Sequence, residues 1–215
     1  FLPTLTVFFG LIVAVLADGK KYESFIKSLI FIPMAISATA ASVIFRFVYN
    51  NDPETGVLNA LLTFILPELE PIPWLGRKGM ANFAVIFAAV WIWTGLAMTI
   101  LSAAYKALPQ EIIEAAIIDG ATAWQRFWRI TLPMLTVPIT FLGVVMIINA
   151  LKMIDLVYVM TMGGPRGGTR VIGYSVFVEM FANGKIGYGS AIGVILLILI
   201  LPIILYQLKQ LRQQL

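Results

Sequence analysis

Long uncharged stretches alternate with short polar segments along almost the whole chain. A helix needs about 20 apolar residues to cross a hydrocarbon core of about 30 Å, because each residue advances it by about 1.5 Å. Backbone polar groups find no water in lipid, so spanning segments of this length are expected to be helical. Five stretches qualify or nearly qualify as spans, namely residues 1–17, 28–45, 79–105, 130–151 and 186–208. The pattern therefore predicts an all-α polytopic membrane protein with five transmembrane helices.

The first of these stretches is short, and it begins with Phe1 instead of a methionine. It lacks a basic segment before its apolar residues, and Leu16-Ala17-Asp18 is a poor cleavage site, so a cleaved signal peptide is not favoured. We expect a sixth span upstream in the full protein. We treat residues 1–215 as one transmembrane domain.

The composition agrees with a membrane protein and narrows the chemistry. Hydrophobic residues make up 60% of the chain and charged residues only 12%, which is outside the usual range of a soluble domain. Cysteine and histidine are both absent from the sequence, which removes thiol nucleophiles, zinc sites and imidazole acid–base catalysis. The sequence also contains no phosphate-binding loop of the Gly-x-x-x-x-Gly-Lys-Ser/Thr type. We therefore expect no catalytic residue, metal or cofactor in this chain.

Basic residues that flank the spans divide unequally between the two sides of the membrane. The larger set is Lys20, Lys21, Lys27, Lys106, Arg126, Arg129, Lys209 and Arg212. The smaller set is Arg77, Lys78, Arg166, Arg170 and Lys185. The positive-inside rule places the larger set in the cytoplasm. None of these residues forms the dense basic run that would indicate nucleic-acid binding.

A polar segment of residues 106–130 separates the third and fourth stretches and is predicted to be cytoplasmic. Pro109 and Glu111 are typical of a helix start, because proline is tolerated in the first turn and a carboxylate complements the helix dipole. Gly120 is typical of a helix end. A helical hairpin that merely turns the chain around would also account for this pattern.

Residues 122–130, which follow that helix, combine aromatic and basic side chains. The residues concerned are Trp124, Arg126, Phe127, Trp128 and Arg129. This mixture is expected of a helix that lies in the membrane interface.

Two motifs in this order resemble a known family. Glu114-Ala115-Ala116, Gly120 and Ile130-Thr131-Leu132-Pro133 resemble the EAA motif of the permease subunits of bacterial ABC importers. Asp119-Gly120-Ala121, and the later Thr161-Met162-Gly163-Gly164-Pro165 with Thr169, are similar to the carbohydrate-uptake branch of these permeases. That branch includes the maltose, trehalose, alpha-glucoside and glycerol-phosphate permeases. The resemblance extends over about residues 1–215.

The resemblance implies that residues 106–130 contain a coupling helix, which inserts into a cleft of a cytoplasmic ATPase subunit. By position, the ATPase-docking residues would be Glu114, Ala115, Ala116, Asp119, Gly120 and Ala121. The ATPase subunits would bind ATP and Mg²⁺, and this chain would import a sugar or sugar derivative by alternating access. The other implied partners are a second homologous permease, a second ATPase subunit, an extracytoplasmic solute-binding protein and membrane lipid. The implied location is the bacterial inner membrane.

The opposite side carries loops of a different kind. Residues 50–56 indicate a turn-rich loop, and residues 57–66 form an apolar segment too short to span. Prolines in residues 67–73, followed by Trp74, indicate an ordered outer cap. The resemblance implies that the outer loops meet the binding protein, whereas ordinary interhelical loops are the alternative.

Polar and aromatic residues in the third and fourth spans are the predicted substrate pathway. Tryptophan faces stack on sugar rings, and a mostly apolar site with a few polar groups suits such a ligand. The resemblance adds residues of the fourth span, at the place where the family contributes polar contacts to sugar. The sequence lacks the asparagine-rich run of the maltose permease there, so the sugar stays open. The predicted pathway residues are Trp91, Trp93, Thr94, Asn149, Lys152 and Met153.

Two other functions fit parts of the sequence. Lys152 and Asp155 lie three residues apart on the predicted fourth helix, where an ion pair would serve an ion-coupled secondary transporter. That reading leaves the Glu114 motif without a purpose. An intramembrane enzyme is the third possibility, and the lack of histidine, cysteine and paired carboxylates argues against it. Finally, Gly10, Gly95 and Gly143 are expected at close contacts between helices.

Overall fold

The computed structural model describes residues 1–212, and side chains as far as residue 210. Within these residues the chain forms helices and connecting segments, without a β-strand. The elements are α1 (Leu2–Ala17), α2 (Glu23–Ala35), α3 (Ala38–Val48), α4 (Val57–Ile65), α5 (Lys78–Lys106), α6 (Gln110–Ile118), α7 (Ala123–Arg126), the π-helical η1 (Phe127–Thr131), α8 (Leu132–Met134), α9 (Thr136–Lys152), α10 (Asp155–Thr161), α11 (Ile172–Phe177), the π-helical η2 (Val178–Ala182) and α12 (Ile186–Arg212). The predicted all-α class is confirmed.

Small residues allow α1 and α2 to approach α5, the longest helix among the described residues. A side-chain carbon at Gly10 of α1 would lie 2.6 Å from Cβ of Ala97, and one at Gly95 would lie 2.9 Å from the carbonyl oxygen of Ile30 in α2. Both distances are shorter than van der Waals contact, so only glycine fits at these crossings. The expected contacts at Gly10 and Gly95 are therefore confirmed. A side-chain carbon at Gly143 would meet no atom of a packed neighbour within 4 Å, so the contact expected at Gly143 is not found among the described residues.

The predicted spans are all helical, but not all of them are single straight helices. Within residues 1–212, only α5 and α12 are by themselves long and apolar enough to cross a membrane. The second predicted span is a pair, α2 and α3, bent by 98°, and the fourth is a pair bent by 64° before α9. The described chain thus has two such helices, or four spans if each bent pair counts as one, beside the shorter apolar α1. The first bend follows from Ser37, whose hydroxyl accepts the amide of Ala40 at 3.2 Å and so starts a new helix.

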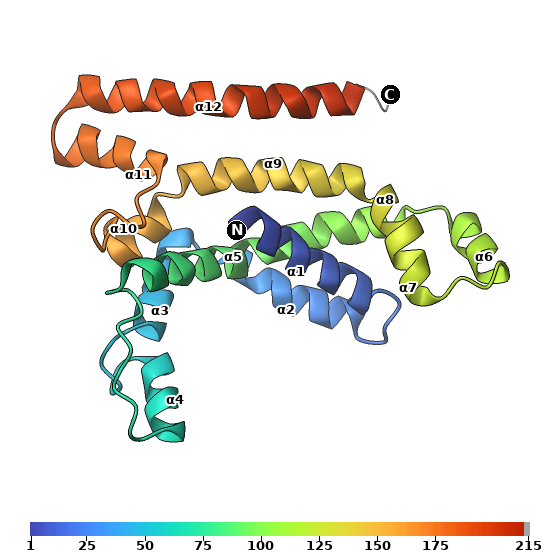
Figure 1. Cartoon of the computed structure of the whole chain (residues 1–215), viewed down its shortest axis with the longest axis horizontal. Coiled ribbons are helices and arrows are strands. Elements are labelled where there is room, and N and C mark those ends of the chain that lie inside the picture. Colours follow the sequence, from blue (N-terminus) through green and yellow to red (C-terminus); the bar gives the residue numbers. More distant parts are fainter. Residues whose placement is uncertain (213–215) are drawn as a thin grey trace.

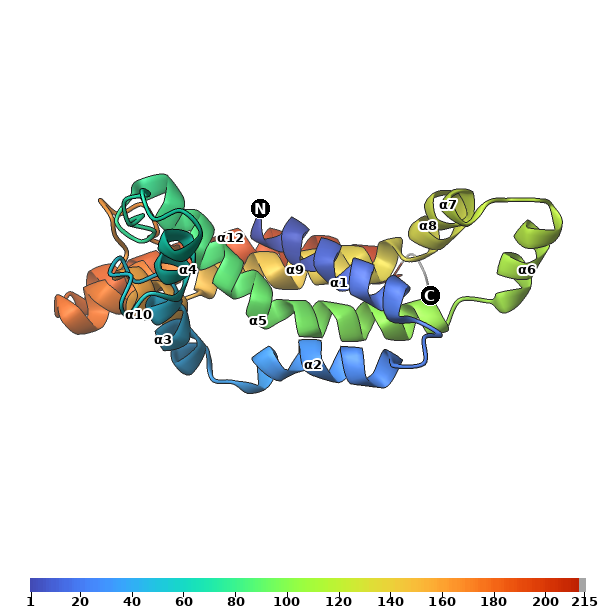
Figure 2. The same cartoon turned by 90° about the horizontal axis from the view of Figure 1, so that it is seen from below.

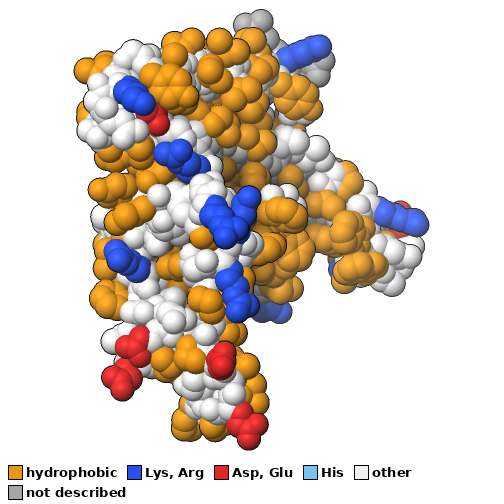
Figure 3. Space-filling model, turned by 60° about the vertical axis from the view of Figure 1, so that its left-hand side comes forward, with side chains coloured by type: hydrophobic (Ala, Val, Ile, Leu, Met, Phe, Trp, Pro, Cys, Tyr) orange, Lys and Arg blue, Asp and Glu red, His pale blue; other side chains and the backbone are white. Residues whose placement is uncertain are grey.

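The helices place the two sets of basic residues at opposite ends of the molecule. In Figure 1 the C-terminal end of α5 and the N-terminal end of α2 lie at the same end as α6, whereas α3, α4 and α10 lie at the other end. Apolar side chains cover much of the face shown in Figure 3, as expected of a surface in lipid. Acidic side chains gather at its lower end, over α4 and its flanking loops, which carry the exposed Asp52, Glu54, Glu68 and Glu70.

One buried asparagine holds the predicted outer cap together. Asn59 of α4 is fully buried. Its Nδ2 lies 3.0 Å from the carbonyl oxygens of Asn50, Asn51 and Ile72. Its Oδ1 accepts the amide of Ile72 at 3.0 Å and the indole N–H of Trp74 at 3.2 Å. A single side chain therefore satisfies the polar groups of both segments that flank α4.

We expect Asn59→Ala to lower the free energy of unfolding by at least about 2 kcal/mol, because it leaves buried donors and acceptors unpaired. The thermal unfolding midpoint of the purified protein, followed by tryptophan fluorescence, measures this loss. Asn51→Ala is the matched control, since the Asn51 side chain is exposed. Equal midpoints for the two variants would contradict the role of Asn59.

Candidate coupling loop and transport cavity

The segment that connects α5 to α9 carries α6 away from the bundle. α5 ends at Lys106, the backbone passes the buried Leu108, and Pro109 precedes the first residue of α6. Figures 1 and 2 both show α6 projecting beyond the end of the bundle. The predicted helix start at Pro109 is confirmed, and most of the surface of the helix faces outward.

The end of α6 is fixed by backbone hydrogen bonds. Gly120 has a φ of 78°, a conformation that glycine adopts without a steric penalty. Its amide donates to the carbonyl of Ile117 at 3.0 Å, and the amide of Ala121 donates to the carbonyl of Ala116 at 2.9 Å. These two bonds define a Schellman motif. The predicted helix end at Gly120 is therefore confirmed, with its physical cause.

A second set of hydrogen bonds starts the next helix without a spacer. The hydroxyl of Thr122 accepts the amide of Gln125 at 3.3 Å, while the Gln125 side chain accepts the amide of Thr122 at 2.8 Å. This reciprocal pair is a capping box. Arg126 then donates from Nη1 to the carbonyl of Ala121 at 2.9 Å. The turn from α6 to α7 is thus closed by local bonds on both sides, so the two helices form a stiff joint.

The predicted docking residues differ in how far they are accessible. Glu114, Ala115, Asp119 and Gly120 are exposed, and Ala121 is half-buried. Ala116 is only 8% exposed, so its side chain faces its own chain.

Isoleucines extend the accessible apolar area on the same helix. Ile112 and Ile117 are exposed, and Ile118 is 85% exposed. Ile118 is the last residue of α6 and was not among the predicted docking residues. Exposed apolar area beside polar residues is typical of a protein interaction surface.

Four predicted pathway residues line one cavity of about 520 Å³. Trp93 belongs to α5, and Asn149, Lys152 and Met153 come from the end of α9 and the break that follows it. The other lining residues are mostly small or apolar and were not among the predicted pathway residues; they belong to α3, α5, α10, α11, α12 and the break before α10. These include Ile154, Leu156, Gly173, Val176, Gly193 and Leu196.

Trp91 and Thr94 lie outside this cavity. An α-helix turns by about 100° per residue, so Trp91 and Trp93 face different sides of α5. The Trp91 ring packs edge-to-face on Phe45 at 5.3 Å between centroids, and the buried Thr94 donates its hydroxyl proton to the carbonyl of Val90 at 2.6 Å. Both line a separate cavity of about 400 Å³ between α1, α2 and α5.

The ion pair between Lys152 and Asp155 does not form. α9 ends at Lys152 and α10 begins at Asp155, so the two residues do not share the single helix on which their spacing was counted. Asp155 instead accepts the hydroxyl of Thr39 at 3.3 Å. Among the described residues no ion pair involves Lys152, and the ion-coupled alternative loses its structural basis.

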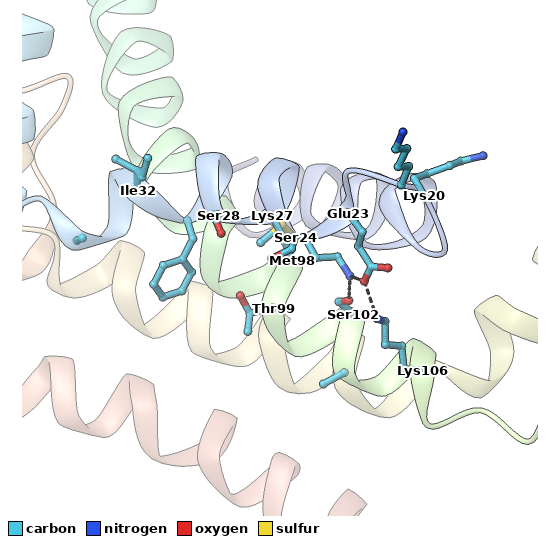
Figure 4. Close-up of a pocket in the computed structure, with 14 residues that line it drawn as sticks. Lys20, Glu23, Ser24, Lys27, Ser28, Ile32, Met98, Thr99, Ser102 and Lys106 are labelled. Carbon is cyan, nitrogen blue, oxygen red and sulfur yellow. Dashed lines mark hydrogen bonds and ion pairs between the residues drawn. The ribbon is translucent and has the colours of Figure 1, made fainter.

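A charge cluster joins the turn between α1 and α2 to the end of α5, where the coupling loop begins (Figure 4). The Glu23 carboxylate contacts Nζ of Lys27 and Nζ of Lys106, each at 2.6 Å. Nζ of Lys106 also lies 3.7 Å from Oδ1 of Asp18. Glu23 precedes the apolar stretch that begins at Ser28, and the ammonium groups of Lys106 and then Lys27 hold its pKa at about 2. The carboxylate is therefore ionised at physiological pH. No local pattern in the sequence indicates the contact between Glu23 and Lys106.

Comparison with known proteins identifies the family of this chain. Residues 6–212 match the family described as binding-protein-dependent transport system inner membrane component. The chain is 45% identical over 214 residues to the osmoprotective compounds uptake permease protein GgtC of Synechocystis sp., covering 98% of this chain and 75% of that protein. It is 39% identical over 212 residues to the alpha-glucoside transport system permease protein AglF of Rhizobium meliloti, covering 96% of this chain and 62% of that protein.

A solved structure has the same fold. The crystal structure of a bacterial ABC transporter involved in the import of the acidic polysaccharide alginate contains a chain that superposes with a TM-score of 0.83 at 22% identity, covering 99% of this chain and 76% of that chain. The predicted family and the predicted inner-membrane location are confirmed by the family match. This chain belongs to the family of inner membrane components of binding-protein-dependent transport systems.

Proposed function

We propose that this chain is the permease subunit of an ATP-driven importer that moves a sugar or sugar derivative into the cytoplasm. The observation that carries the proposal is the projecting α6, which presents Glu114 and Ala115 on an exposed surface and ends in a stiff joint. Such a helix transmits a displacement of a bound partner to the bundle, because no flexible loop lies between them to absorb the movement. The names of the relatives, which refer to alpha-glucosides and osmoprotective compounds, support a small polar organic cargo.

The partner on α6 is a cytoplasmic ATPase subunit. Ala115 lets a cleft wall approach closely, Glu114 pairs with a basic group, and the exposed isoleucines of α6 contribute apolar area. The full assembly contains two ATPase subunits, which bind ATP and Mg²⁺, a second homologous permease and an extracytoplasmic solute-binding protein. ATP binding and hydrolysis favour different orientations of the bundle through differential affinity for α6.

The cargo passes the cavity lined by Trp93, Asn149 and Lys152. Its volume of about 520 Å³ is within the range of about 300–1,000 Å³ usual for small-molecule sites. The Trp93 ring offers a face for the apolar side of a sugar ring, while the Asn149 amide and the Lys152 ammonium donate to hydroxyl groups. The cargo is thus held by one aromatic face and a few hydrogen bonds, which suits a ligand that must be released.

We expect Glu114→Lys to reduce ATP-driven uptake at least about 10-fold, because the variant places like charges together in the docked interface. Uptake of radiolabelled sugar into proteoliposomes loaded with ATP measures the effect, and co-purification of the ATPase measures docking. Glu54→Lys makes the same charge change at an exposed position on the opposite side and should leave co-purification of the ATPase unchanged. Normal docking and uptake in Glu114→Lys would refute the coupling role of α6.

We expect Gly120→Ala to loosen the joint after α6, since a side chain at positive φ costs about 1–2 kcal/mol. Hydrogen–deuterium exchange of the α6 amides should become at least about 5-fold faster. Gly187→Ala is the control, because Gly187 lies in α12 with ordinary φ and free space around it. If exchange in α6 is the same for both variants, Gly120 does not set the geometry of the joint.

We expect Trp93→Ala to raise the sugar concentration for half-maximal uptake about 10-fold through the loss of stacking, and Asn149→Ala to raise it about 5-fold through the loss of one hydrogen bond. The measurement is uptake against sugar concentration at a fixed level of ATP. Phe83→Ala removes an exposed aromatic side chain elsewhere on α5 and should leave the curve unchanged. Unaltered transport in both Trp93→Ala and Asn149→Ala would exclude this cavity from the pathway.

A further inference from the structure

A third cavity, of about 950 Å³, lies between α2 and α5 at the end of the bundle that carries the coupling loop. One end of its lining is polar and contains Lys20, Lys21, Glu23, Ser24 and Lys27, with Lys106 of α5. The other end is formed by Phe31, Ile32, Ala35 and Met98. Figure 4 shows Lys20 and Glu23 at one end and Ile32 at the other. The cavity therefore changes from charged to apolar along the direction of α2.

The polar end carries excess positive charge. Four lysine ammonium groups share one lining carboxylate, that of Glu23, which leaves a formal charge of +3, or +2 if the nearby Asp18 is included. Glu23 is already occupied by Lys27 and Lys106. Lys20 and Lys21 lie in the exposed turn at the mouth, and within the described residues neither has a carboxylate partner within 4 Å. An anion at the mouth would complement them.

The apolar end fits a hydrocarbon chain. The cavity follows α2 from Ser24 to Ala35, and these 12 residues span about 16 Å of helix. This length is close to half of a hydrocarbon core of about 30 Å, the depth of one leaflet. Phe31 and Ile32 are 42% and 54% exposed, so the apolar end opens to the bundle surface and not only to its charged mouth.

We propose that this cavity binds an anionic phospholipid of the cytoplasmic leaflet, with its phosphate among Lys20, Lys21 and Lys27 and one acyl chain along Phe31 and Ile32. A free inorganic anion would use only the charged mouth, and a neutral lipid would use only the apolar end. The combination of the two in one cavity selects a lipid with a negative head group. The bound lipid would lie beside the charge cluster that ties α2 to the start of the coupling loop.

The test uses the full-length protein, in the assembly in which it is purified from the membrane, and adds lipid in mixed micelles. Dioleoylphosphatidylglycerol should raise the thermal midpoint and be retained in native mass spectra, whereas dioleoylphosphatidylcholine with identical chains and inorganic phosphate should do neither. Lys20→Gln combined with Lys21→Gln should weaken the apparent affinity for phosphatidylglycerol about 30-fold, from about 1 kcal/mol for each lysine near a membrane surface.

Lys185→Gln combined with Lys209→Gln removes the same charge from two other exposed positions and should leave the affinity within about 3-fold of the original. Ser24→Glu adds a carboxylate at the mouth without removing any existing contact of the cluster, so it should also weaken binding while the lipid-free midpoint is unchanged. Equal stabilisation by the two lipids, equal stabilisation by phosphate, or equal loss in both lysine pairs would overturn the proposal. The proposal would also be overturned if another subunit covered this cavity in the purified assembly. None of these results would affect the proposed transport function, which depends on α6 and the cavity lined by Trp93 and Asn149.

Discussion

Close packing against α5 is the constraint on which the rest of the structure depends. Buried alanines along this helix, together with Gly95, give it a narrow surface that α1 and α2 approach almost to backbone contact. In lipid the hydrophobic effect does not drive helices together, so dispersion contacts at short distance provide much of the attraction. A single added methyl group at Gly10 or Gly95 would push a whole helix away. The position of α5 helps to fix all three cavities, because each is lined in part by residues of this helix.

The same helix links the bundle to the projecting α6. Its last residue, Lys106, pairs with Glu23, and the chain then enters α6 within four residues. The Schellman motif and the capping box close the other side of α6. Because both attachments are short and hydrogen-bonded, a displacement of α6 moves the end of α5 and the start of α7 with it. Because Lys106 pairs with Glu23, the first residue of α2, that helix would move with the end of α5 as well.

Two interrupted helix pairs border the proposed transport cavity. α2 and α3 are interrupted at Ile36 and Ser37, and α9 ends shortly before α10 begins. Non-helical backbone at membrane depth is tolerated where it lines a cavity or is buried in protein. The hydrogen bond between Thr39 and Asp155 joins the segments that follow the two interruptions. This arrangement leaves Lys152 facing the cavity, where an uninterrupted helix would have allowed it to pair with Asp155.

The sequence by itself determined the helical class, the membrane location, the start and end of α6 and the family. These follow from local properties: run length, proline and glycine conformation, and a motif of fixed spacing. It also identified four residues that share a cavity. Trp93 was chosen for its chemistry and its depth in the third span, whereas Asn149, Lys152 and Met153 were chosen from their position in the family resemblance. The tertiary structure alone decided which side of α5 each residue faces, so Trp91 and Thr94 lie elsewhere. It alone decided the breaks in two spans, the contact of Glu23 with Lys106 across 83 residues of sequence, and the burial of Ala116. Such facts depend on which surfaces meet when the helices pack, and no local pattern records that.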